Sequence, residues 1–214
     1  DYNRAGLPLM ELVTEPVIHD AETATSFARE LQLLLRYLGA GEANMEKGEM
    51  RVEANISVSK TDKLGTLVEI KNLNSFRTVE RAIKYEIERQ IAALEAGEVV
   101  VRETRGWDDT KQITFSQRKK ESSEDYRYFP EPDLPKLVLS EVPSFADDVI
   151  KKSLPELPWE RRARYESLGL KAGDIAFLIE TKARSAFFDA VAAVLRFEAS
   201  LLMLAANYTT SDLA

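Results

Sequence analysis

The sequence predicts an α+β fold in which a mixed or antiparallel sheet carries helices on one face and a small all-helical unit follows. Three observations predict this fold. Strand-like and helix-like patterns follow one another through residues 1–140, two of these stretches repeat apolar residues at helical spacing, and only helical patterns remain after residue 172. Because the pattern changes between residues 140 and 150, we expect one unit over residues 1–145 and a second over residues 146–214.

Composition narrows the class of protein. The chain has 214 residues, of which 44% are hydrophobic and 30% are charged, as is typical of a globular protein. It has no Cys, which excludes disulfides, thiolate metal sites and Cys nucleophiles, and with His19 as its single histidine a Ser-His-Asp triad is not expected. The net charge of −7 argues against a large phosphate-binding surface on these residues, and no apolar run is long enough to predict a membrane span.

Several common signals are missing from the sequence. It has neither the P-loop pattern nor the Gly-x-Gly-x-x-Gly pattern of dinucleotide-binding folds, so we expect no nucleotide site of either kind. No signal peptide opens it, and its first residue is Asp1 rather than Met. We therefore expect the sequence to be part of a longer protein.

A strand and then a helix are expected first. Residues 7–17 carry apolar side chains between two prolines and predict a strand. Asp20 is a suitable N-cap for a helix whose apolar positions recur every three to four residues, and Gly39 and Gly41 end it.

Residues 50–59 and 66–72 predict two strands joined by a polar connection. In the first of them, apolar and polar residues alternate, so one face is buried and the other is polar. A hairpin closed by this connection would place Glu53 opposite Lys71 and Asn55 opposite Glu69. One face of the sheet would then carry Arg51, Glu53, Asn55, Glu69 and Lys71.

The remaining elements follow in order. Asn74 or Ser75 is expected to cap a second helix that runs to about residue 96. Residues 99–107 and 112–119 predict another hairpin. The segment 125–135, with three prolines, predicts an extended stretch. Short helical pieces broken by prolines are then expected, followed by helices over residues 174–181 and 184–208.

Three carboxylates are candidates for chemistry. Glu11 lies within an apolar strand-like segment, and Glu53 and Glu69 share the predicted polar face. Carboxylates that cluster with Lys and Asn suit a hard cation such as Mg²⁺ that holds a nucleotide. Equally, Glu11 could face water from a half-exposed strand, and the polar face could simply be solvated, as one face of an antiparallel sheet often is. The pattern alone leaves both interpretations open.

The other candidates are basic or isolated residues. Arg4 and Lys71 could grip phosphate, although each also fits an ordinary surface charge. A functional His needs a partner that orients it, and the sequence identifies none for His19, so we expect it to be structural or exposed. The segment 125–135 could be a rigid connector between the two units, and its pattern alone does not place Arg127 at a site.

Four blocks of the sequence resemble one known family. They are NRAGLPLMELV at residues 3–13, MRVEANISV at 50–58, EIKNLNSF at 69–76 and DYRYFPEPDL at 125–134. In this order they resemble the B subunit of the aspartyl/glutamyl-tRNA amidotransferase over about residues 1–140. The segment AANY at residues 205–208 is similar to part of the helical domain of that family.

The resemblance implies a cradle-like α+β unit, distantly similar to glutamine synthetase, in a complex with the glutaminase (A) subunit and the small C subunit. The B subunit of that family uses ATP and Mg²⁺ to phosphorylate the side-chain carboxylate of Glu on tRNA(Gln) or of Asp on tRNA(Asn). Ammonia from the glutaminase subunit then forms the amide. The resemblance thus implies an ATP-dependent carbon–nitrogen ligase with misacylated tRNA as a partner and no membrane partner, in the cytoplasm or an organellar matrix.

The resemblance also implies roles for individual residues. Glu11 matches a metal ligand and is expected to take part in catalysis, as is Lys71. Glu69 matches a second ligand, and Glu53, where the family also has Asp, is expected near the metal. The residues expected to contact the nucleotide or substrate are Arg4, Arg51, Asn55 and Arg127.

Two parts of the family's pattern have no match in these residues. They are an N-terminal segment with further Glu and His metal ligands and a C-terminal tail that binds tRNA. We therefore expect residues 1–214 alone to be inactive. A non-enzymatic alternative stays open, in which the chain is a scaffold that docks the glutaminase subunit and tRNA and the carboxylates are merely solvated.

Overall fold

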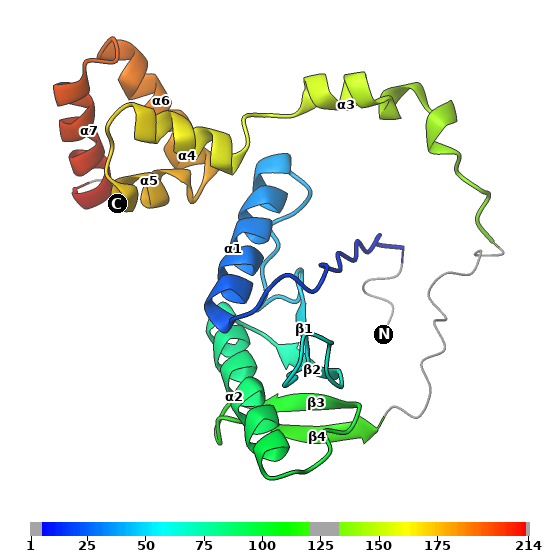
Figure 1. The fold of residues 1–214 in the computed structure, drawn as a ribbon. Helices are drawn as coiled ribbons and strands as arrows, with labels where there is room; N and C mark the ends of the chain where they lie inside the picture. The colour runs from blue at the N-terminus through cyan, green and yellow to red at the C-terminus, as the bar shows by residue number, and fades with distance from the viewer. Residues whose placement is uncertain (1–5, 120–132, 213–214) are drawn as a thin grey trace.

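The computed structural model describes residues 6–119 and 133–212. Its strands form one four-stranded sheet in the order β1 (Val52–Ile56), β2 (Val68–Leu73), β3 (Glu103–Asp108) and β4 (Ile113–Lys119). The pairs β1–β2 and β3–β4 are antiparallel, whereas β2 and β3 are parallel. Figure 1 shows the sheet with its helices, and the expected α+β class with a mixed sheet is confirmed.

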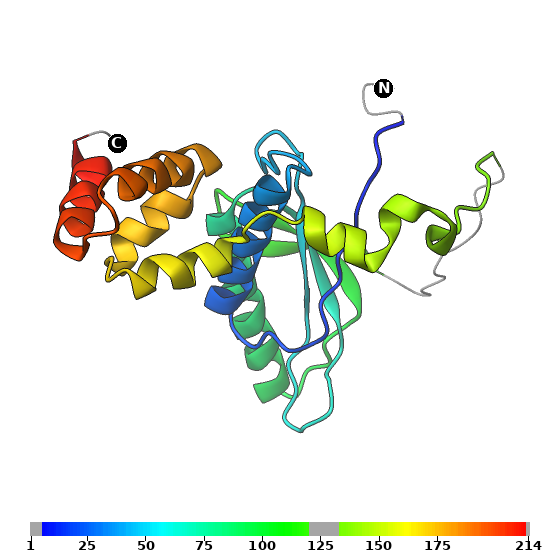
Figure 2. The same cartoon turned by 90° about the horizontal axis from the view of Figure 1, so that it is seen from above.

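Two long helices cover one face of this sheet. α1 (Ala21–Leu38) begins after Asp20, whose side chain accepts a hydrogen bond from the Thr23 N–H at 2.6 Å, and it ends at Gly39, whose φ of 70° suits glycine. α2 (Phe76–Glu95) connects β2 to β3. Figure 2 shows both helices on the same side of the strands. The core between helices and sheet comprises Ala21, Met45, Ile56, Ile70, Leu73, Val79, Ala82 and Ile83.

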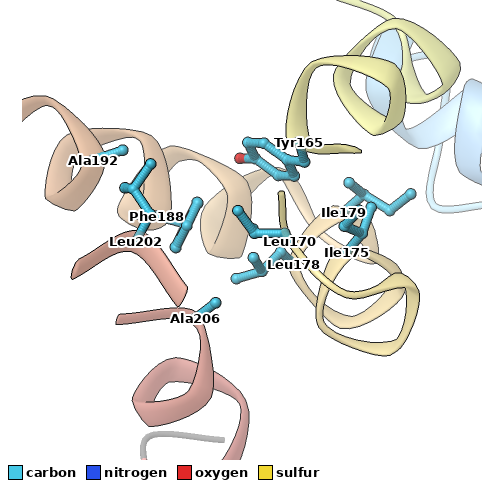
Figure 3. Close-up of a cluster of buried hydrophobic side chains, with 9 residues drawn as sticks. All are labelled: Tyr165, Leu170, Ile175, Leu178, Ile179, Phe188, Ala192, Leu202 and Ala206. Atoms are coloured by element: carbon cyan, nitrogen blue, oxygen red, sulfur yellow. The ribbon is translucent and has the colours of Figure 1, made fainter. Parts of the chain in front are cut away.

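The second half of the described chain is helical. It comprises η1 (Leu139–Glu141), η2 (Pro143–Phe145), α3 (Asp147–Ser153), α4 (Pro158–Ser167), α5 (Ala172–Ile179), α6 (Lys182–Val194) and α7 (Ala199–Ser211). Helices α4 to α7 enclose a separate apolar core (Figure 3), with Tyr165 and Phe188 ring centroids 5.3 Å apart at its centre. In the part of the chain that is described, no helix is both long and apolar enough to cross a membrane.

Helix α1 joins the two cores. Its last turn places Tyr37 inside the helical unit, where the tyrosine is 1% exposed. The Tyr37 hydroxyl donates to the Ile179 carbonyl oxygen and contacts Ser185 Oγ, each at 2.9 Å. On the outside of the junction, Arg162 of α4 pairs with Glu30 of α1 at 2.9 Å. The sheet and the helical unit therefore share one helix. The boundary near residue 145 stays a prediction.

Two expected elements are wrong. Residues 7–17 form no strand: they run as an extended segment in front of α1, and Leu9 in this segment is 92% exposed. The expected helix over residues 184–208 is broken between α6 and α7, where Arg196 and Phe197 have positive φ angles of 51° and 58°. This turn folds α7 back, so that Leu202 packs in the same core as Phe188.

Candidate functional site

Over residues 54–56 the pairing of β1 with β2 has the register that the sequence predicts. The register shifts between Val52 and Ala54, so that Val52 lies opposite Leu73, and the expected position of Glu53 directly opposite Lys71 stays a prediction. Asn55 lies opposite Glu69. The alternate residues Ile56 and Ile70 are buried against the helices, so the polar residues between them lie on the open face. Gly65 closes the connection. A Cβ atom there would lie 2.1 Å from the carbonyl oxygen of Val58, so only glycine permits this close return of the chain.

Lys71 joins two carboxylates on the open face. Its Nζ atom lies 3.2 Å from Glu53 Oε2 and 3.6 Å from Glu69 Oε1. The three side chains differ in exposure: 45% for Glu53, 40% for Lys71 and 13% for Glu69. Partial burial acts to lower the pKa of Lys71, but the hydrogen bond and charge of Glu53 and the charge of Glu69 outweigh it and raise the pKa. Lys71 is therefore a fixed positive charge between two negative ones.

Thr104 of β3 completes this group from the neighbouring strand. It lies directly opposite Glu69 in the parallel β2–β3 pair, and its Oγ1 donates to Glu69 Oε2 at 2.9 Å. The sequence did not single out Thr104, because no local pattern indicates that β3 pairs with β2. We call Glu53, Glu69, Lys71 and Thr104 the sheet-face cluster.

The face of the sheet that packs against α2 carries a buried ion network. Glu86 of α2 is fully buried and accepts hydrogen bonds from Arg89 at 2.6 Å, Gln90 at 3.0 Å and Thr114 at 2.9 Å. Arg105 Nε of β3 lies 3.5 Å from Glu86 Oε2. The sequence contained a signal for this network. Glu86 and Gln90 lie seven and eleven residues after Val79, on the apolar stripe of α2.

The network continues into β3 through Glu103. Its carboxylate accepts hydrogen bonds from Ser116 and from Arg105. Burial acts to raise the pKa of Glu103, but these two hydrogen bonds and the charge of Arg105 outweigh it and lower the pKa. The strand that carries Thr104 is thus bound firmly to β4 and, through Glu86, to α2.

The donor set of the sheet-face cluster suits Mg²⁺ bound to a nucleotide. Mg²⁺ prefers oxygen ligands and is commonly held by one or two carboxylates, with phosphate oxygens and water completing its shell. Glu53 and Glu69 supply two such carboxylates. Among the described residues, no three acidic or histidine side chains are grouped to hold a metal, so Glu11 does not join Glu53 and Glu69 in such a group. Two carboxylates fit a metal whose remaining ligands are phosphate oxygens and water.

The other candidate residues lie in different surroundings. Glu11 is exposed in the extended segment before α1, and His19 is also exposed. Arg51 and Asn55 are exposed, Arg51 immediately before β1 and Asn55 within it. Arg4 and Arg127 lie outside the described residues. The structure thus brings Glu53, Glu69 and Lys71 together, and the roles expected for all these residues stay predictions.

The chain thus forms an α+β unit whose open sheet face carries a cluster of acidic and basic groups. Residues 1–143 match the model of a family described as the GatB/GatE catalytic domain. The chain is 47% identical over 217 residues to the B subunit of the aspartyl/glutamyl-tRNA(Asn/Gln) amidotransferase of Trichormus variabilis, and 47% identical to that of Crocosphaera subtropica. It is 45% identical over 218 residues to the B subunit of the chloroplastic/mitochondrial glutamyl-tRNA(Gln) amidotransferase of Ricinus communis.

The chain belongs to the B-subunit family of these tRNA-dependent amidotransferases. All three alignments cover 100% of the chain, but only 43%, 42% and 38% of the three relatives in the same order. The chain therefore spans less than half the length of the curated relatives that it matches. Membership agrees with the resemblance on which the sequence prediction rested.

Proposed function

We propose that these residues form part of the phosphorylating centre of a tRNA-dependent amidotransferase, with the sheet-face cluster at the site. The observation that carries the proposal is the Glu53–Lys71–Glu69 arrangement on the open face of the sheet, in a chain of this family. The whole enzyme would be an ATP-dependent carbon–nitrogen ligase. It would act in the cytoplasm or an organellar matrix, together with the glutaminase (A) subunit, the small C subunit and a misacylated tRNA.

The proposed reaction has two steps. A side-chain carboxylate oxygen of Glu on tRNA(Gln), or of Asp on tRNA(Asn), attacks the γ-phosphorus of ATP. The bond to the bridging oxygen breaks, and ADP leaves with that electron pair. Ammonia, released from glutamine by the glutaminase subunit, then attacks the carbonyl carbon of the acyl phosphate. Phosphate leaves, one proton is lost from nitrogen, and the amide remains.

The residues of the cluster have separate roles in this proposal. Lys71 would donate hydrogen bonds to phosphate oxygens from a position set by its two carboxylates, and its charge would stabilise the transferring group. Glu69 and Glu53 would hold Mg²⁺, which when bound neutralises phosphate charge. Asn55 would donate a hydrogen bond from its side-chain amide to the phosphate or to the substrate. Arg51, Arg4 and Arg127 remain candidates for phosphate contacts, and Glu11 remains a candidate ligand and catalytic residue.

Phosphate release tests this proposal in the full-length protein reconstituted with its partner subunits. Glu69→Gln should lower phosphate release from ATP in the presence of misacylated Glu-tRNA(Gln) by at least about 100-fold while the complex still assembles, because it removes a carboxylate that would hold Mg²⁺. Glu11→Gln is assayed beside it. Glu88→Gln is the matched control, since Glu88 is exposed on α2, in the layer on the other side of the sheet.

A scaffold without catalysis is the second candidate function. It is favoured by neighbouring apolar side chains that the extended segment before α1 leaves exposed, with Leu7 at 68%, Leu9 at 92% and Met10 at 73%, since a continuous exposed apolar stretch suits docking to partner subunits. If Glu69→Gln and Glu11→Gln both keep wild-type turnover, the cluster is not the active centre and the scaffold is the better account. Loss of turnover in Glu88→Gln as well would point to a general loss of structure instead.

A further inference from the structure

We propose that Thr104 is a positioning residue whose hydroxyl holds one oxygen of the Glu69 carboxylate, so that the carboxylate keeps one orientation at the open face of the sheet. The inference rests on the proposed function, because it assigns Thr104 a part in binding metal through Glu69. Its basis is that the two oxygens of Glu69 have different surroundings. Thr104 donates to Oε2 at 2.9 Å, whereas Oε1 lies 3.6 Å from Lys71 Nζ.

Burial holds the Thr104 hydroxyl in place. Thr104 is 5% exposed, and its β-branched side chain has few rotamers available in a strand. A hydrogen bond from a hydroxyl to a charged carboxylate is stronger than one between neutral groups. Glu69 has the longer side chain with more rotatable bonds, so the carboxylate adapts to the hydroxyl and not the reverse.

The residues on either side of Thr104 anchor its backbone from the opposite face. Glu103 and Arg105 are joined there by a contact of 2.5 Å, and Arg105 Nε donates to Thr114 Oγ1 at 2.8 Å. The register between β3 and β4 shifts between Thr104 and Arg105. With both neighbours bound into the buried network, the backbone at Thr104 cannot move away from Glu69 without breaking several hydrogen bonds.

Orientation of this kind matters for metal binding. Carboxylates that bind metals are themselves commonly held by hydrogen bonds, and loss of such a partner typically weakens metal affinity about 10- to 100-fold. Lys71 Nζ already lies 3.6 Å from Glu69 Oε1, so without Thr104 the Glu69 carboxylate could rotate and bring its second oxygen to Lys71 as well. Both oxygens would then be paired with Lys71, so metal binding should weaken.

A Mn²⁺ titration tests this role directly. Mn²⁺ substitutes for Mg²⁺, and its free form is counted by electron paramagnetic resonance in the full-length protein with its partner subunits. Glu69→Gln identifies the Mn²⁺ site that depends on Glu69. Thr104→Val keeps the shape and removes the hydroxyl, and it should weaken binding at this site by about tenfold or more. Thr104→Ser keeps the hydroxyl and should restore most of the affinity.

Thr114 supplies the matched control. It is also a buried strand threonine, 3% exposed, and its Oγ1 donates to a glutamate oxygen at 2.9 Å, but that glutamate is Glu86 on the helix side. Thr114→Val should lower the melting temperature and leave Mn²⁺ affinity unchanged. A purely structural role for Thr104 would make the two valine variants behave alike.

The possible outcomes separate the two proposals. If Glu69→Gln weakens Mn²⁺ binding and Thr104→Val does not, the role of Thr104 is wrong and the metal site stands. If Thr104→Ser loses as much affinity as Thr104→Val, or Thr114→Val loses as much, the effect is one of packing and the inference is also overturned. If Glu69→Gln binds Mn²⁺ as the wild type does, the metal site of the proposed function is wrong, and the role of Thr104 with it.

Discussion

Glu156 shares its carboxylate between two arginines of α4. Arg164 donates to both oxygens, at 2.6 and 2.8 Å, and Arg161 donates at 2.7 Å. Asp189 of α6 holds the other side of Arg164 at 3.0 Å. The hydrogen bonds from Arg164 lower the pKa of Glu156 most, and the hydrogen bond from Arg161 lowers it further. Partial burial acts in the opposite direction, and the resulting pKa is about 2. The carboxylate is thus more acidic in the folded chain than in the unfolded one.

This pKa predicts acid sensitivity of the helical unit. The stabilisation that the ionised Glu156 carboxylate gives the folded chain is complete above its ordinary pKa of 4.5. It is lost as the pH falls from 4.5 towards 2. Glu156→Gln should lower the free energy of unfolding at pH 7 by about 2 kcal/mol, a value reduced for solvent screening of this partly exposed group. It should also flatten the loss of stability between pH 4.5 and 2, as measured by urea unfolding at several pH values.

Glu166→Gln is the control for this titration. Glu166 is exposed on the same helix, and substituting it should change stability by less than about 0.5 kcal/mol at every pH. Equal slopes of stability against pH for Glu156→Gln and the wild type would show that the low pKa of Glu156 does not stabilise the fold.

At the scale of elements, α2 begins at a capping residue that the sequence left as a choice between two. The structure selects Ser75, whose Oγ accepts a hydrogen bond from the Thr78 N–H at 3.1 Å. Asn74, one residue earlier, is exposed. Since α2 packs against the sheet and carries Glu86, its first turn helps to hold the layer beneath the sheet-face cluster.

Removal of this cap should cost stability. Ser75→Ala should lower the free energy of unfolding by about 1 kcal/mol, because the Thr78 N–H loses its acceptor. Asn74→Ala, the alternative cap, should change it by less than about 0.5 kcal/mol. Urea unfolding of both variants at pH 7 measures the difference. A larger loss of stability for Asn74→Ala than for Ser75→Ala would show that Asn74, and not Ser75, caps the helix.

The elements that were predicted wrongly share a cause. Residues 7–17 have the composition of a strand, but a strand needs a partner for its backbone hydrogen bonds, and none of the four described strands pairs with them. No proline or glycine lies between α6 and α7 to indicate in the sequence that the helix breaks there. It follows from packing, since the turn brings Leu202 and Ala206 onto Phe188.

At the scale of the whole molecule, the described sheet and helical unit are linked through α1. Tyr37 is buried in the helical unit while the first turn of the same helix, at Ala21, packs in the sheet core. Loss of the Tyr37 side chain should uncouple the two cores, because it leaves a cavity and removes the hydroxyl that bonds Ile179 and Ser185.

The two tryptophans of the chain report on the two cores separately. Trp107 packs against the sheet core and Trp159 lies in α4. In residues 1–214, single-tryptophan variants should show coincident urea transitions, and Tyr37→Ala should separate them, with the helical unit unfolding first. Tyr208→Phe, at an exposed tyrosine of α7, should leave the transitions coincident. Transitions that coincide in Tyr37→Ala would contradict the coupling.

Local sequence patterns are sufficient to predict several features of this protein. Helical periodicity and capping residues placed α1 and α2, and alternation together with a polar connection gave the pairing of Asn55 with Glu69. These features depend on residues close together in the chain, whose spacing repeats with the geometry of a helix or a hairpin. The four sequence blocks that resemble the family are likewise local, and family membership followed from them.

Contacts between residues far apart in the chain depend on how the elements pack. Thr104 and Glu69 are 35 residues apart, and they touch because β3 pairs with β2 in parallel after α2 crosses the sheet. Tyr37 reaches Ser185 across 148 residues. No periodic pattern specifies such contacts, since they arise when buried faces from separate elements pack together and satisfy their polar groups.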